Sequence, residues 1–257
     1  MKAFIAAAAC ATAILPSPAV AQSTDLGRSV ADLVGTLITT GKQRRLTAEL
    51  STPLTYDPAA GPLDPANKAD PRNLEIAGVR IGMTVREAQL ALRGAGYIDE
   101  GPRDDQPSYM GRVMWAWQAE YGVGPNTNDR TTRELVWNKG EEEITVSLLA
   151  LPDGPRVESV FYWAKDGAPI SKDEFTRRVL AKYGEPVNDD PNDLRWCTVK
   201  APECEKPPEQ TYPLLVAWPN GRQLRLFGND PGLKQALDQR FAADVLRRKP
   251  ADKAPSF

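Results

Sequence analysis

Apolar residues recur every three or four positions in several stretches of the chain, and this spacing predicts amphipathic helices. The first such stretch covers residues 22–50, and the last covers residues 231–248. Between them, helices are predicted to follow Thr84 and Ser171, because each has a glutamate three positions later, the spacing of a capping box. A further short helix is predicted at residues 109–121.

Apolar and polar residues alternate in the middle of the chain, and this period of two predicts strands. Residues 132–137, 143–151 and 156–164 alternate in this way and are separated by turns that contain glycine. They therefore predict a three-stranded antiparallel meander. Residues 99–107 are rich in Asp, Pro and Gly, and we expect them to form a loop.

A second group of strands is predicted nearer the C-terminus. Residues 213–218 and 223–227 lie on either side of Asn220-Gly221, a dipeptide that favours a tight hairpin turn. A short strand is predicted just before this hairpin, at residues 194–198. The helix predicted after Ser171 precedes all three of these strands.

A helix followed by strands therefore occurs twice, in residues 84–164 and again in residues 171–227. Antiparallel strands combined with separate helices are typical of α+β domains, in which the helices cover one face of the sheet. We predict an α+β domain over residues 73–248, and the repeated order indicates two tandem helix-plus-strands units.

The first 21 residues have the pattern of a secretory signal peptide. Lys2 is followed by an apolar run that ends at Leu15, and Ala19-Val20-Ala21 is an Ala-x-Ala cleavage sequence. The apolar run is shorter than the roughly 20 residues that a membrane-spanning helix needs. We therefore expect cleavage after Ala21 and a mature chain without a membrane span.

Two other segments are predicted to lie outside the folded domain. Residues 51–72 are rich in proline, which is incompatible with a regular helix, and we expect an extended linker. Residues 249–257 are expected to form a disordered tail.

Two cysteines follow the predicted cleavage site, Cys197 and Cys204. In an oxidising compartment such a pair predicts a structural disulfide that closes a short loop. Two thiols alone make a poor metal site, and the chain contains no histidine that could complete one. The signal peptide and the disulfide together predict a periplasmic or secreted protein.

The sequence offers little for catalysis. The absence of histidine removes the commonest general base, and no phosphate-binding loop, dinucleotide fingerprint or nucleophile elbow occurs. Residues 188, 190 and 192 alternate like ligands in a calcium loop, but Asp193 and Val199 do not fit the sixth and twelfth positions. We expect a solvated turn there, no catalytic residue, no metal and no cofactor.

Charge also limits the choice of partner. The chain has 32 Lys and Arg residues against 34 Asp and Glu residues, so its net charge is only −2. This balance provides no electrostatic footprint for nucleic acid, and we expect none to bind.

Aromatic residues are the better candidates for a functional surface. Side chains alternate along a strand, so Phe161 and Trp163 are predicted on one face and Tyr162 on the other. Helices cover only one of these faces, and we expect the other to be a binding platform. Trp115 and Trp117, in the predicted helix 109–121, are candidates to extend it; packing in the core is the alternative role for all five.

One stretch of the chain is similar to known proteins. The phrase Ile81-Gly82-Met83-Thr84-Val85-Arg86-Glu87-Ala88, with Leu92 and Gly96, resembles the opening of small-protein-A-type outer-membrane assembly lipoproteins. Their relatives include the β-lactamase-inhibitor proteins, which are built from tandem helix-plus-strands units. The resemblance implies a non-catalytic protein-binding module. The chain differs from the lipoproteins in having no cysteine at the cleavage site.

Three functional hypotheses remain open. The first is an exported, non-catalytic binding module of the bacterial envelope, whose partner is a protein or a cell-envelope polymer. The second is an envelope hydrolase or lyase that uses carboxylates, because such groups need only meet in space. The third is a structural envelope protein that self-associates through residues 22–50.

Overall fold

A computed structural model of the 257-residue chain describes residues 49–55, 70–121, 129–168, 170–188, 190–197 and 213–247. The chain divides into two compact units, Met1–Arg45 and Leu46–Phe257, and all described residues belong to the second. The predicted signal peptide at 1–21, most of the predicted helix at 22–50, residues 56–69 of the linker and the tail at 249–257 lie outside the described residues. The fold below is that of the second unit.

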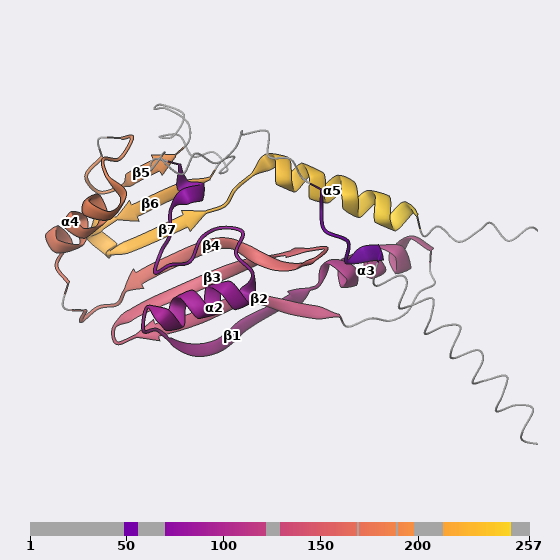
Figure 1. The fold of residues 1–257 in the computed structure, drawn as a ribbon, viewed down its shortest axis with the longest axis horizontal. Helices are drawn as coiled ribbons and strands as arrows, with labels where there is room; N and C mark the ends of the chain where they lie inside the picture. Colours follow the sequence, from indigo (N-terminus) through magenta and orange to yellow (C-terminus); the bar gives the residue numbers. More distant parts are fainter. Residues whose placement is uncertain are drawn as a thin grey trace, which may run out of the picture. The chain divides into compact units, whose positions relative to one another are not determined.

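Seven antiparallel strands form one sheet, whose strand order is β1-β2-β3-β4-β7-β6-β5 (Figure 1). The strands are β1 (Ile98–Pro107), β2 (Arg130–Lys139), β3 (Glu142–Leu151), β4 (Gly154–Ala164), β5 (Leu194–Cys197), β6 (Leu214–Trp218) and β7 (Gln223–Phe227). Together with four helices, this sheet confirms the predicted α+β class.

The predicted meander and hairpin are both present. Strands β2, β3 and β4 pair in succession, and β6 pairs with β7. The hairpin connection contains a 3-10 turn, Pro219–Gly221, and the left-handed residue is Arg222, with φ 49°. The two groups of strands meet where β4 pairs with β7, so they form a continuous sheet.

Helices α2 (Val85–Gly94) and α4 (Lys172–Tyr183) pack on the same face of this sheet. Figure 1 shows α2 lying across β2 and β3, with α4 at the end of the sheet that contains β5 and β6. The main core lies between these helices and the sheet. Its largest fully buried side chains include Leu92, Trp137, Ile144, Trp196, Leu215 and Leu226.

Local sequence explains where both helices begin. Thr84 accepts a hydrogen bond from the Glu87 backbone, and the Glu87 carboxylate accepts one from the Thr84 backbone at 2.8 Å, which completes the predicted capping box. At α4, Ser171 accepts from the Glu174 backbone, but the Glu174 carboxylate binds Arg177 and Arg178 instead. Only half of the second predicted capping box is therefore formed.

A smaller core lies beside the sheet. It joins α3 (Tyr109–Tyr121), α5 (Pro231–Leu246) and the short segment that contains Leu50. Asp230 accepts hydrogen bonds from the first backbone amides of α5, as expected for a helix that starts with Asp-Pro. None of the helices in the described ranges combines the length and the apolar character needed to cross a membrane.

The prediction of a loop at residues 99–107 is wrong, because these residues belong to strand β1. Strand β1 is an edge strand that pairs only with β2, and three register shifts interrupt the pairing. Gly101 adopts a φ of 89° at the first of these shifts. Edge strands and bulges tolerate Pro and Gly, and an exposed strand needs no apolar alternation.

Candidate functional site: the far face of the sheet

Strand β4 carries aromatic residues on both of its faces. Val160 and Tyr162 point toward the helices and belong to the main core, where the Tyr162 ring stacks on Phe175 with centroids 6.4 Å apart. Phe161 and Trp163 therefore lie on the opposite face, and both are half-buried. The predicted alternation is confirmed, and Tyr162 packs, partly buried, against the main core on the face opposite Phe161 and Trp163.

We call the face opposite α2 and α4 the far face. Strand register brings residues from β7 and β6 next to the two aromatic residues there. Phe161 is opposite Arg225, which is opposite Val216, and Trp163 is opposite Gln223. Cys197, Leu214, Val216 and Phe227 form an apolar cluster on this face, and Trp218 packs against it. The far face thus combines aromatic side chains with one central arginine.

Arg225 is unusual among these residues because its guanidinium has no direct polar contact with another described residue. Its guanidinium lies over the Phe227 ring, 4.3 Å from the centroid, and forms no hydrogen bond or ion pair. The Nε atom is buried without a partner. Burial lowers the pKa of the Arg225 guanidinium, while the charges of Glu134 and Glu158 oppose that change.

A cavity of about 420 Å³ lies on the far face beside Arg225. Ser147 and Ser159 form part of its floor, and they are opposite each other on β3 and β4. Ser159 is only 7% exposed, and its side chain lines this cavity. Glu134 and Glu158 line the same cavity, so it presents both signs of charge and two hydroxyl groups.

Trp115 and Trp117 do not belong to this surface. They lie on α3, which packs through the smaller core against Leu149 and Leu151, near the end of β3. Trp163 is opposite Glu143, near the start of β3. Six residues of strand separate Glu143 from Leu149, which corresponds to about 20 Å. Trp115, 50% exposed, is therefore a separate surface residue.

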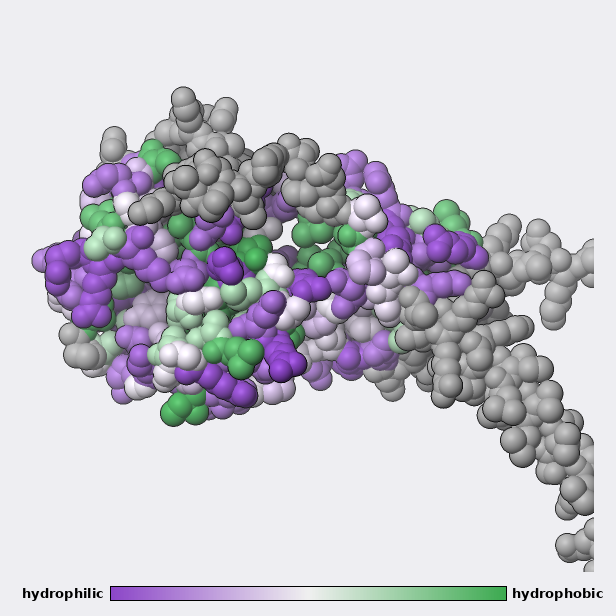
Figure 2. Space-filling view, viewed as in Figure 1, coloured by the Kyte–Doolittle hydropathy of each residue, from purple (hydrophilic) through white to green (hydrophobic). Residues whose placement is uncertain are grey.

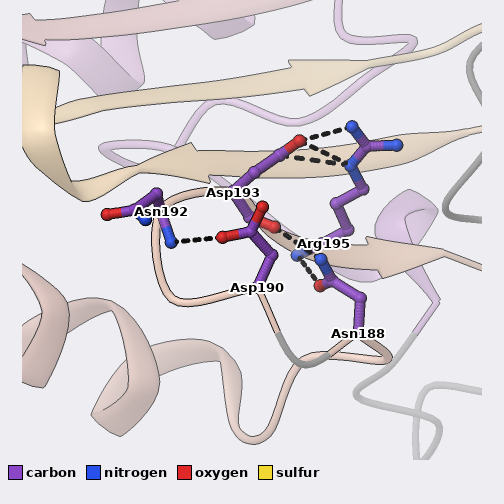
Figure 3. Close-up of polar contacts among 5 residues, drawn as sticks. All are labelled: Asn188, Asp190, Asn192, Asp193 and Arg195. Atoms are coloured by element: carbon purple, nitrogen blue, oxygen red, sulfur yellow. Dashed lines mark hydrogen bonds and ion pairs between the residues drawn. The ribbon is translucent and has the colours of Figure 1, made fainter.

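The acidic turn before β5 satisfies its own polar groups (Figure 3). Asp190 accepts from the Asn192 backbone at 2.9 Å, Asp193 is ion-paired with Arg195, and Asn188 bonds both Asp193 and the Arg195 backbone. These bonds confirm a turn and leave no set of converging carboxylates. No group of three or more Cys, Asp or Glu residues that could hold a metal occurs in the described ranges.

Only one of the two cysteines of the predicted disulfide belongs to the described residues. Cys197 ends β5 and is buried in the far-face cluster, whereas Cys204 lies outside the described residues. The Cys197–Cys204 bond therefore stays a prediction.

A larger cavity, about 760 Å³, adjoins the far-face cavity, and Leu149 and Glu158 line both. Figure 2 shows a hollow with hydrophobic side chains around it, between α5 and the ends of β3 and β4. Its lining includes Leu54, Ile81, Leu149, Leu151 and Leu237. Some of its polar groups have structural partners: Asp153 pairs with Arg156 at 2.6 Å, and Asp230 caps α5.

Sequence reasoning missed Arg225 and Ser159. Each lies in a strand that was predicted, but their proximity depends on the β4–β7 pairing, for which no turn or spacing gave a signal. No protein-family model matches the chain, and no curated protein or solved structure is significantly similar to it.

Proposed function

We propose that this chain is an exported, non-catalytic binding module of the bacterial envelope, periplasmic or secreted, that holds a protein partner on the far face of its sheet. The single observation that carries the proposal is Arg225, a half-buried guanidinium without a polar partner among the described residues, placed beside Phe161 and Phe227. Tryptophan, other aromatic residues and arginine dominate the energetics of protein interfaces.

Several features support a protein rather than a polymer as the partner. The far face offers apolar contact through Trp163 and Trp218, and a partner would remove these half-buried side chains from water. The resemblance of residues 81–88 to envelope lipoproteins and inhibitor proteins implies the same type of activity. The signal-peptide pattern of residues 1–21 and the predicted Cys197–Cys204 disulfide favour export.

Crosslinking of the tagged chain in intact envelopes, followed by mass spectrometry, tests the proposal. Phe161→Ala and Trp163→Ala should each reduce capture of the dominant protein at least tenfold, as expected for hot-spot residues. Trp115→Ala is the matched control, because Trp115 is an exposed tryptophan outside the far face. Capture of envelope polymer alone, or equal losses in all three variants, would exclude a protein partner on this face.

A carboxylate-dependent hydrolase or lyase is the second candidate, because Glu134 and Glu158 line one cavity. Paired carboxylates in a shared cleft can act as general acid and base. Envelope polymers should then be cleaved by the wild-type chain, and Glu134→Gln and Glu158→Gln should each abolish the cleavage. Full binding by both variants, with no cleavage by the wild type, would support the binding module instead.

The hypothesis of self-association through residues 22–50 is independent of the far face. Light scattering of the mature chain with and without residues 22–50 tests it. If the number of chains per particle is the same with and without residues 22–50, the hypothesis of self-association through this segment is wrong.

A further inference from the structure

The far-face cavity is lined by the half-buried Arg225, which forms no hydrogen bond or ion pair with another described residue, and by Glu134 and Glu158, whose charges favour its guanidinium without a direct ion pair. A desolvated charge or donor that lacks a partner is costly, and proteins normally pair it. Arg222 provides a comparison, since its Nε is also buried without a partner, yet its terminal nitrogen binds Asp166 at 3.2 Å. Arg225 forms no such ion pair, so its guanidinium is available to a carboxylate from outside the described fold.

The arrangement of charges restricts what that partner can be. A guanidinium is best satisfied by a carboxylate, which it can bind through two hydrogen bonds, and the Ser159 hydroxyl beside it can donate a third. A simple anion would also lie near Glu134 and Glu158, whose negative charges oppose it. A ligand that fits must therefore present a cationic amino group to these glutamates as well as a carboxylate to Arg225.

The size of the cavity limits the ligand further. Its volume of about 420 Å³ is near the lower end of the roughly 300–1,000 Å³ that is usual for ligand pockets. Arg133, at its rim, is neutralised by Asp104 at 3.4 Å and adds no net charge. The cavity thus fits a few residues of a peptide rather than a large charged polymer.

We propose that this cavity binds a short peptide carrying both a free carboxylate and a free amino group, with the carboxylate on Arg225 and Ser159 and the amino group by Glu134 and Glu158. The proposal rests on the proposed function, because it assigns the ligand chemistry of the same far face. It identifies the partner as peptidic and assigns the two ends of the bound segment to different residues of the cavity lining.

Titration of the isotope-labelled full chain with dipeptides, followed by NMR, tests this inference. Alanyl-alanine should shift the amide signals of Ser159 and Arg225 saturably. Amidation of its carboxylate should weaken binding about tenfold or more, and acetylation of its amino group should do the same, as expected for loss of a charge-assisted hydrogen bond. Equal affinity for the free and the amidated dipeptide, or no saturable shift at millimolar concentrations, would overturn it.

Two substitutions assign the ends of the ligand. Arg225→Gln should abolish the discrimination between free and amidated dipeptide, and Glu134→Gln should reduce the discrimination between free and acetylated dipeptide. Arg80→Gln is the control, because Arg80 is an exposed arginine that does not line the cavity. This substitution should leave the discrimination against the amidated and against the acetylated dipeptide unchanged. If Arg225→Gln does not fold, the blocked dipeptides still test the wild-type chain.

The two proposals can fail separately. If dipeptides bind but no protein is captured in a way that depends on Phe161 and Trp163, the ligand site is supported and the protein partner is excluded. Capture that depends on these aromatic residues but not on Arg225, with no dipeptide binding, would retain the binding module and overturn the ligand assignment.

Discussion

Asp244 is the residue whose replacement should most clearly weaken the attachment of α5. Its carboxylate is 2% exposed and accepts hydrogen bonds from Arg240 Nε at 2.7 Å and from the Tyr109 hydroxyl at 3.0 Å. Arg240 also donates to the Glu49 backbone carbonyl at 3.2 Å. One carboxylate therefore connects α5 with α3 and, through Arg240, with the segment that contains Leu50.

The expected cost of Asp244→Ala follows from what the substitution leaves behind. Removing one member of a buried ion pair costs about 3–5 kcal/mol, because the remaining charge is left desolvated. Arg240 keeps 18% of its side chain exposed and retains its bond to Glu49, so we expect the lower end, about 3 kcal/mol. Tyr109→Phe removes only one hydrogen bond to the carboxylate and should cost about 1.5 kcal/mol.

Urea unfolding of the full chain measures these differences, and hydrogen exchange with mass spectrometry locates them. Peptides from α3 and α5 should lose protection before those from the sheet, because the affected contacts lie in the smaller core. Asp238→Ala is the control on the same helix: Asp238 is exposed, and its removal should change stability by less than about 0.5 kcal/mol. A cost below about 1 kcal/mol for Asp244→Ala would refute the reasoning.

Three further predictions concern the capping box and the glycines. Thr84→Ala should cost about 1 kcal/mol in urea unfolding, and Thr84→Ser should restore most of it. Hydrogen bonds from Thr84 lower the pKa of the Glu87 carboxyl from its ordinary value of 4.5. The stabilisation by this carboxylate is therefore present above pH 4.5 and lost as the pH falls through the lowered pKa. The loss of stability in Thr84→Ala should consequently become smaller in acid. Gly111→Ala would bring its Cβ into a steric clash with the Asp129 carbonyl oxygen and should lower the free energy of unfolding by about 2 kcal/mol or more. Gly94→Ala, in open space within α2, should instead raise the free energy of unfolding by about 0.5 kcal/mol, and thermal unfolding measures both changes. Equal effects of the two glycine substitutions would contradict the steric explanation.

Local signals in the sequence were sufficient for most elements of the fold. The capping residue Thr84, the glycine turns of the meander and the Asp230-Pro231 start of α5 act within a few residues, so a single sequence reveals them. Strand β1 escaped prediction because an edge strand exposed to solvent is not required to alternate. The half-formed capping box at Ser171 was also unpredictable, since Arg177 and Arg178 compete for the same carboxylate.

The candidate site was predictable only in part, for a different reason. Alternation along β4 correctly separated Phe161 and Trp163 from Tyr162, because the period of a strand is fixed by its geometry. The position of Arg225 depends on which strand lies next to β4. That choice is made by long-range packing, and nothing near Arg225 in the sequence encodes it.

The pairing of β4 with β7 has a consequence for the order in which the sheet can assemble. Every other ladder joins strands that are consecutive in the sequence, whereas β4 can pair with β7 only after two intervening strands, so that Phe161 and Arg225 meet late. Until β7 is in place, Ser159–Trp163 is an unprotected edge of aromatic and β-branched residues, the type of segment that pairs with other chains. Long-range pairing of this kind slows folding. Pairing with β7 therefore removes this exposed edge as well as completing the sheet.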